Sequence, residues 1–141
     1  QETVLDKVVR PARFRILPDH TFRQNDPAVV GVEVLAGTLQ NNRNVGYFEG
    51  NEFERAGGLS GIQKQGEDVD EARAGERVSI AIDGPTVGRD VEEGDTLWTE
   101  VPEKHAKILE QELRSELTAD EREALQGYLD TRRKRDPFWG K

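Results

Sequence analysis

Apolar residues recur along the chain with two different periods, and the period changes near Val101-Pro102. Before this point, short alternating or wholly apolar runs are separated by Gly, Pro, Asn or Asp. After it no glycine occurs until Gly127, and the apolar residues follow a helical period. Alternation between turn residues is typical of strands, whereas a period near 3.6 residues is typical of helices. The pattern predicts a mainly β body followed by an α-helical extension.

Six runs in the first part of the chain predict strands. Val78, Ile80 and Ile82 alternate with small residues, so one face of this run is apolar, as in the wall of a barrel. Gly31 and Gly37 are expected to mark where another strand, which follows an Asp-Pro turn, bends or ends. The predicted strands are residues 13–17, 28–36, 45–48, 58–63, 77–83 and 96–101.

The last forty residues predict two helices. The first is expected to begin at Pro102, because proline is favourable at the first position of a helix. The second is expected to begin at Thr118, where Glu121 completes a capping box, and to end before Pro137. One face of the first helix carries Ala106, Leu109, Leu113 and Leu117, and one face of the second carries Leu125, Tyr128, Leu129 and Arg132.

These patterns divide the chain into three segments. Residues 1–9 are interpreted as the end of a linker helix, residues 10–101 as a β-barrel, and residues 102–141 as a two-helix extension with a basic and aromatic tail. A chain of 141 residues is long enough to bury one hydrophobic core.

The charge of the chain restricts the partners that it can bind. Charged residues make up 34% of the sequence and the formal net charge is −8. The periodic apolar runs argue against disorder, so the charges are expected on the surface. An acid excess with only six lysines is typical of salt-loving microbes. Because an acidic protein repels phosphate, any binding of nucleic acid requires local basic patches.

Several classes of function are excluded by what the sequence lacks. Without cysteine, and with two histidines, the chain cannot form a zinc site by known spacings. It contains no G-x-S-x-G motif, and residues 84–90 depart from the phosphate-loop spacing and lack its lysine. We therefore expect neither an enzyme nor a bound cofactor in this chain. No signal peptide or long apolar run is visible, so a cytoplasmic protein without membrane attachment is expected.

Basic side chains in loops at one end of the predicted barrel are candidates for binding a phosphate backbone. They are Arg23, before the Asp26-Pro27 turn, Lys64, at the end of a strand, and Arg89, after a glycine-rich loop. Positively charged loops on a rigid barrel are suited to this task. The alternative is that each side chain merely balances neighbouring acids.

Short sequence phrases over residues 10–141 also carry a family resemblance. They are Ile16-Leu17-Pro18, Phe22-Arg23, Asp26-Pro27-Ala28, Gly31-Val32, Gly75-Glu76-Arg77-Val78, Ile82-Asp83-Gly84, Gly88-Arg89 and Asp136-Pro137-Phe138-Trp139-Gly140. In this order and spacing they resemble the C-terminal domain of archaeal and eukaryotic translation initiation factor 5B, a relative of bacterial initiation factor 2.

The resemblance implies a closed antiparallel β-barrel, like domain two of elongation factor Tu, followed by two C-terminal helices. It implies that the parent is a ribosome-dependent GTPase, with GTP and magnesium bound in a domain that this fragment lacks. This fragment would be a non-catalytic monomer that binds the aminoacyl acceptor end of initiator methionyl-tRNA and promotes joining of the ribosomal subunits.

The resemblance also suggests roles for individual residues. Arg23 and Arg89 match basic phrases of the family, and Lys64 fits a stretch that is basic near the methionyl end in bacterial relatives, although Gln63 there is neutral. Val32 stands where bacterial relatives have a cysteine, so specificity for formyl-methionine is not implied.

An alternative is a protein-interaction module that docks initiation factor 1A or a ribosomal protein through its helices. Aromatic residues beside arginine are favoured in interfaces, although Phe138 and Trp139 could instead pack back onto the barrel. The residues proposed for this contact are Leu125, Tyr128, Arg132, Phe138 and Trp139.

Overall fold

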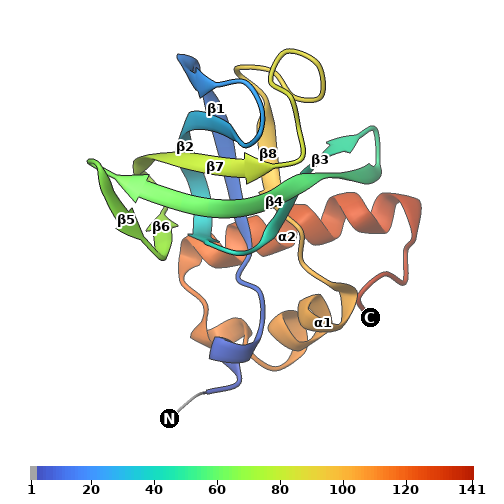
Figure 1. Cartoon of the computed structure of the whole chain (residues 1–141). Helices are drawn as coiled ribbons and strands as arrows, with labels where there is room; N and C mark the ends of the chain where they lie inside the picture. The colour runs from blue at the N-terminus through green and yellow to red at the C-terminus, as the bar shows by residue number, and fades with distance from the viewer. Residues whose placement is uncertain (1–2) are drawn as a thin grey trace.

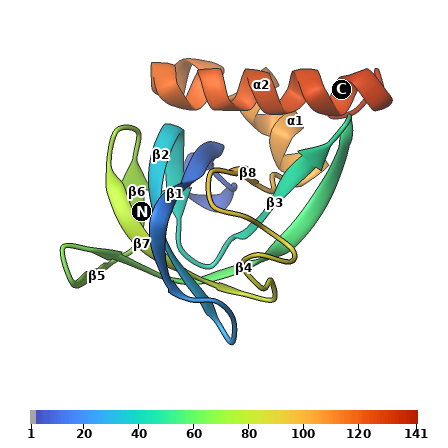
Figure 2. The same ribbon diagram turned by 90° about the horizontal axis from the view of Figure 1, so that it is seen from above.

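Strands from the first hundred residues join in one sheet, and six of them close into a barrel (Figures 1 and 2). The computed structural model describes residues 3–141. The order around the barrel is β1-β8-β3-β4-β7-β2, and antiparallel pairing of β1 with β2 closes it. This confirms the closed antiparallel barrel that the sequence predicted. The strands are β1 (Ala12–Arg23), β2 (Ala28–Gln40), β3 (Asn44–Glu49), β4 (Glu52–Lys64), β5 (Glu67–Val69), β6 (Glu71–Arg73), β7 (Arg77–Asp83) and β8 (Thr96–Thr99).

The alternating apolar residues fill the interior of the barrel, as predicted. Val30 and Val32 of β2 are fully buried, and they lie opposite Ile80 and Val78 of β7. Both strands therefore present one apolar face inward, which fixes their register, since a slip of one residue would turn every apolar side chain outward.

Several strand boundaries differ from the predicted ones: β1 continues to Arg23 and β8 ends at Thr99. β4 begins six residues before Gly58, because the backbone continues through the glycines. A Cβ on Gly57 would lie 2.1 Å from the carbonyl oxygen of Asp83, so glycine permits the close approach of β4 to the end of β7. Gly37, at φ +85°, lies inside β2 and does not end it. Strands β5 and β6, of three residues each, were not predicted because such short runs have no visible period.

Two helices and a short 3-10 helix follow the barrel. They are α1 (Glu103–Gln111), η2 (Arg114–Glu116) and α2 (Ala119–Arg135). The first helix was predicted to continue through Leu117 but ends at Gln111, where η2 takes over. Leu113 and Leu117 are nevertheless buried in the same core as Leu109. The capping box of α2 is confirmed, because the backbone N–H of Glu121 donates to the Thr118 hydroxyl at 3.2 Å and that of Thr118 donates to the Glu121 carboxylate at 3.0 Å.

Helix α2 lies across the barrel and packs mainly against β2 (Figure 2). Its Tyr128 is almost fully buried, and its ring lies within 5.6 Å of the rings of Phe48 and Phe53. The Tyr128 hydroxyl accepts a hydrogen bond from the backbone N–H of Val101 at 3.2 Å. Burial raises the pKa of Tyr128, and the hydrogen bond from Arg132 opposes this shift. Tyr128 thus joins both helices to the end of β8.

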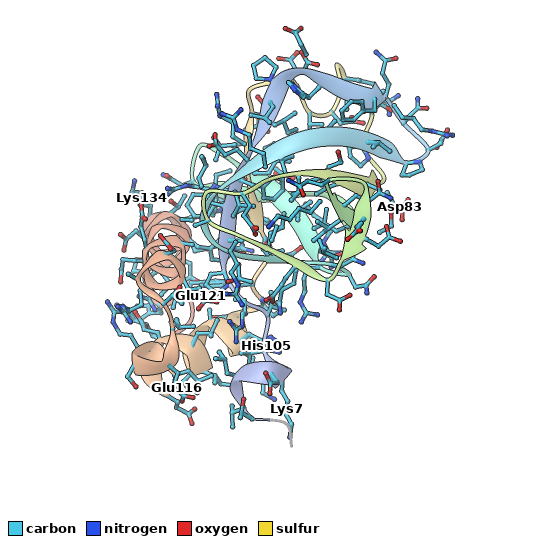
Figure 3. The ribbon with its side chains drawn as sticks, turned by 90° about the vertical axis from the view of Figure 1, so that its left-hand side faces the viewer. Lys7, Asp83, His105, Glu116, Glu121 and Lys134 are labelled. Carbon is cyan, nitrogen blue, oxygen red and sulfur yellow. The ribbon has the colours of Figure 1, made fainter. Side chains whose placement is uncertain are left out.

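The N-terminal segment forms a single 3-10 turn, η1 (Leu5–Lys7), where the end of a linker helix was predicted. Gln1 and Glu2 of that segment lie outside the described residues. The following residues are held by side chains of the helices: the backbone N–H of Val9 donates to Nδ1 of His105 at 3.0 Å, and Arg10 forms an ion pair of 3.1 Å with buried Glu121 (Figure 3).

We expect the bond between Val9 and His105 to make stability depend on pH. Nδ1 accepts a hydrogen bond only when it is unprotonated, and burial, aided by the charges of Arg43 and Lys104, lowers the pKa of His105 below its ordinary value. The unfolded chain therefore binds this proton more tightly, and stability should fall as the pH drops from about 6.5 towards the lowered pKa.

Urea unfolding at several pH values would measure this effect. His105→Asn keeps a hydrogen-bond acceptor but removes the titration. The unfolding free energy of the parent should therefore fall relative to that of the variant as the pH drops below about 6.5. Parallel curves for the two proteins would contradict this interpretation.

Candidate nucleic-acid interface

An open groove of about 340 Å³ lies between the end of β1, the β4–β5 hairpin and β7. Its walls include Phe22, Gln63, Gln65, Arg77 and Ser79. Among residues 3–141 no carboxylate lines this groove, although the chain contains 28 acidic residues. Arg77 contributes a positive charge, and its guanidinium lies 4.0 Å from Glu33. The groove is therefore a place where a ligand with negative charge meets no acid directly.

The wall formed by β1 depends on a glycine in the neighbouring strand. A Cβ on Gly31 would lie 2.9 Å from the Cβ of His20, so only glycine lets this histidine lie against β2. Nδ1 of His20 lies 2.6 Å from the carbonyl oxygen of Pro18. Because a carbonyl oxygen only accepts, Nδ1 must carry the proton, which leaves Nε2 available to a ligand.

Phe22 stands at the edge of the groove with 64% of its surface exposed. Its ring contacts that of His20 edge-to-face, with 6.4 Å between the centroids. An exposed aromatic face beside polar side chains can stack on a nucleobase.

Arg23 and Arg89 are two of the three predicted contacts. Arg23 is the last residue of β1, and the loop that follows it contacts the loop that carries Arg89. The backbone N–H of Val87 donates to the carbonyl oxygen of Gln24 at 2.9 Å, which joins the two loops. Nε of Arg23 donates to the carbonyl oxygen of Asn25 at 2.8 Å, and none of the ion pairs among the described residues involves Arg23.

The charge of Arg89 is shared with its neighbour in the sequence. Its guanidinium lies 3.1 Å from the carboxylate of Asp90. The hydrogen bond from Arg89, with a further one from the backbone of Thr86, lowers the pKa of Asp90, so this acid stays ionised. The pair is exposed to solvent, where such an interaction contributes little and can be exchanged for a phosphate.

Lys64 lies apart from the two arginines, in the β4–β5 hairpin. Its ammonium group pairs with Glu76, and this hydrogen bond is the main cause of the lowered pKa of Glu76. Gln63 and Gln65, on either side of Lys64, line the groove. The loop after Arg23 and the loop of Arg89 are therefore in contact, although neither arginine is among the residues that line the groove, and Lys64 lies in a different hairpin, paired with Glu76.

The residues predicted for a protein partner are only partly on the surface. Leu125 and Tyr128 are buried beneath α2, and the ring of Trp139 packs on Tyr128 with 5.8 Å between the centroids. The guanidinium of Arg132 lies 4.8 Å from the ring centroids of both Phe53 and Trp139. Phe138 is 78% exposed. Hence Leu125, Tyr128 and Trp139 support the fold, and Phe138 and the edge of Arg132 remain for a partner.

The groove also contains residues that were not predicted. His20 was not named as a candidate, and Arg77 and Phe22 were noted only for their place in strands or family phrases. A signal was present in Gly31, because a glycine inside a strand often marks close approach of another chain segment. The segment that approaches Gly31 is the part of β1 between Ile16 and Thr21, where the pairing of β1 with β2 is interrupted. This interruption has no signal in the sequence.

Within residues 3–141 no group of three or more His, Cys, Asp or Glu side chains is placed to hold a metal ion. Nor is any helix described there long and apolar enough to span a bilayer.

The closed six-stranded antiparallel barrel, followed by helices, belongs to the fold class of the barrel domains of translation factors. The chain belongs to the family described as elongation factor Tu domain 4, whose sequence model matches residues 10–98.

Particular relatives agree with the resemblance to archaeal initiation factor 5B and confirm it. The chain is 89% identical over all 141 residues to a protein of Halorubrum lacusprofundi described as a probable translation initiation factor IF-2, and 72% identical to a protein of Halobacterium salinarum with the same description. Both are from halophilic archaea, in accord with the composition. The chain spans 24% of the length of each relative.

A solved structure shows the same fold. GDP-bound aIF5B from Aeropyrum pernix superimposes with a TM-score of 0.88 at 33% identity, over 97% of this chain and 23% of that one.

Replacement of Gly31 tests the wall of the groove. Gly31→Ala places a Cβ against His20, and we expect a loss of about 1–3 kcal/mol of unfolding free energy because the site is already close-packed. Gly61→Ala is the matched control, since a Cβ there meets no atom within 4 Å. Urea unfolding compares the two; equal stability would show that His20 does not rest on Gly31.

Proposed function

We propose that this chain binds the aminoacyl acceptor end of initiator methionyl-tRNA, as one domain of a longer initiation factor that promotes joining of the ribosomal subunits. The observation that supports the proposal most directly is the acid-free groove with exposed Phe22 at its edge, in a chain of net charge −8. The family membership and the initiation-factor relatives agree with it.

The acceptor end is a single-stranded ligand, and its chemistry matches the rim of the groove. Unpaired bases stack on aromatic side chains, for which Phe22 is available. Phosphates contact arginines and fix the register of the strand, for which Arg23, directly before one loop, and Arg89, in the loop that contacts it, are available. Lys64 can join them only by leaving Glu76, so we assign it a secondary contribution.

The remaining functions of the longer protein lie outside this chain in our proposal. GTP and magnesium would bind another domain, and this chain would act in the cytoplasm as a monomeric, non-catalytic arm. A GTPase assay on the chain alone should show no turnover.

Loss of either Arg23 or Arg89 should weaken binding of the tRNA. For Arg23→Ala or Arg89→Ala we expect roughly a tenfold lower affinity for methionylated initiator tRNA, about 1.4 kcal/mol. Filter binding or fluorescence anisotropy across a salt series measures it.

Arg73→Ala is the matched control for Arg89→Ala. The side chains of Arg73 and Arg89 are 75% and 73% exposed, and each pairs with a nearby acid, Glu71 or Asp90. The control should bind like the parent. If Arg23→Ala and Arg89→Ala both bind the tRNA as tightly as the control at low salt, the assignment of these two arginines to the tRNA contact is wrong.

The end of α2 supports a second candidate function, docking of initiation factor 1A or a ribosomal protein. A cavity of about 240 Å³ there is lined by Phe53, Arg132 and Trp139 among others. Exposed Phe138 directly precedes Trp139 in the sequence. Arginine and aromatic side chains of this kind are the usual anchors of protein interfaces.

Phe138→Ala tests this second candidate without disturbing the core, because the side chain is largely exposed. We expect binding of factor 1A, measured by calorimetry, to weaken at least tenfold while binding of the tRNA is unchanged. Phe22→Ala is the complementary variant and should affect only the tRNA. Normal binding of factor 1A by Phe138→Ala would exclude the assigned contact.

A further inference from the structure

The two parts of the chain differ in charge. Residues 102–141 contain nine basic and nine acidic residues, so the net charge of −8 lies in residues 1–101. Five of the six lysines also lie outside the barrel strands, at positions 7, 104, 107, 134 and 141. The negative charge of the barrel therefore repels a polyanion, whereas the helical part, with no net charge, repels it least.

Helix α1 presents two of these lysines on one face. Lys104 and Lys107 are three residues apart, so they are neighbours on the helix surface. Both side chains are exposed, and neither takes part in the ion pairs found within residues 3–141. Their charges are thus available to a ligand.

The acids of α1 are engaged elsewhere. Glu103 accepts a hydrogen bond from the backbone N–H of Gly140 at 2.9 Å, and Glu110 holds Arg133 through two bonds of 2.8 and 3.0 Å. Glu112, the remaining acid of this region, comes after the last residue of the helix. Among residues 3–141, neither Lys104 nor Lys107 forms an ion pair with these acids.

Arg43, from the loop between β2 and β3, extends the positive surface. Nε of Arg43 donates to the side-chain oxygen of Gln40 at 3.2 Å, and no carboxylate within residues 3–141 forms an ion pair with Arg43. The same oxygen of Gln40 also accepts a hydrogen bond from the backbone N–H of Arg10 at 3.1 Å. The preceding residue, Val9, donates to His105 of α1 at 3.0 Å, so Arg43 is linked to the start of α1. Lys7 lies at the same lower end of the molecule as His105 (Figure 3).

We propose that Lys104, Lys107 and Arg43 form a second RNA-binding surface, which contacts the phosphate backbone of a double-stranded RNA. The inference rests on the proposed function in one respect, namely that RNA is the polyanion that a translation factor meets. Lysines are depleted in protein interfaces, whereas lysine and arginine are the usual contacts of phosphate backbones. The helical face thus fits RNA better than an acidic protein.

This surface is distinct from the groove. Figure 1 places α1 at the opposite end of the molecule from the tip of the β1–β2 hairpin, which carries Phe22 and Arg23. The acceptor end at one pole and an RNA helix at the other would hold the domain between two RNA elements.

The probe is a blunt-ended RNA duplex of about 16 base pairs, which offers phosphates but no single-stranded end. Binding of the parent and of Lys104→Gln/Lys107→Gln is measured by anisotropy over a range of KCl concentrations, with circular dichroism confirming the fold at each one. We expect the double variant to bind roughly tenfold more weakly at about 0.1 M KCl. The salt slope of log K should fall by about 0.9 per lost contact.

Two controls separate this surface from charge in general and from the groove. Lys134→Gln removes an exposed lysine at the end of α2 and should change duplex affinity less than Lys104→Gln does (Figure 3). Arg23→Ala/Arg89→Ala should keep duplex binding even if the proposed tRNA contact is lost, so the two hypotheses can fail separately.

Three results would overturn the inference. They are no binding of the duplex by the parent, equal losses for Lys134→Gln and Lys104→Gln, and equal competition by polyglutamate at the same charge concentration. The last would show that the surface selects acidic protein.

Discussion

Pairing of β1 with β2 is the constraint on which the other features depend, because it turns an open sheet into a barrel. It begins at Ala12 and Gly37, where a Cβ on the glycine would lie 2.1 Å from the carbonyl oxygen of Pro11. It ends at Arg23 and Val29, beyond the interruption that follows Ile16. The strand that closes the barrel therefore also carries His20, Phe22 and Arg23 to its rim. Rigidity of the rim and closure of the barrel have a common cause.

A second set of contacts attaches the helices to this barrel. Tyr128 contributes most, because it packs against Phe48, Phe53 and Trp139 and its hydroxyl binds the backbone of Val101. Aromatic pairs of this geometry stabilise beyond the burial of their area. The contacts leave the end of α2 and one face of α1 exposed on the surface.

The fold could be predicted from the sequence where a period was long enough to be visible. Val30, Val32 and Val34 on one strand and Val78, Ile80 and Ile82 on another gave the barrel wall, and Thr118 with Glu121 gave the start of α2. β5 and β6 were too short to show a period. Leu109, Leu113 and Leu117 are all buried although α1 ends at Gln111, so the apolar pattern could not distinguish one long helix from α1 followed by η2.

The candidate site was less predictable, because its geometry depends on contacts between distant residues. The loop after Arg23 and the loop of Arg89 are joined by a backbone hydrogen bond, and Lys64 pairs with Glu76 from the turn before β7. Neither contact has a local signal in the sequence. Burial of Tyr128 and Trp139 likewise depends on Phe48 and Phe53 of a distant hairpin. An aromatic residue next to arginine looks the same in a sequence whether it faces solvent or the core.

The central claim is that the rim formed by β1, the β4–β5 hairpin and β7 receives the end of an adaptor RNA. The most direct measurement is a map of backbone amide chemical shifts on addition of a methionylated minihelix that reproduces the acceptor stem. The account predicts that the largest changes fall on residues 20–23, 63–66 and 77–79. Changes confined to α2 and the C-terminal residues, with these three segments unmoved, would contradict it.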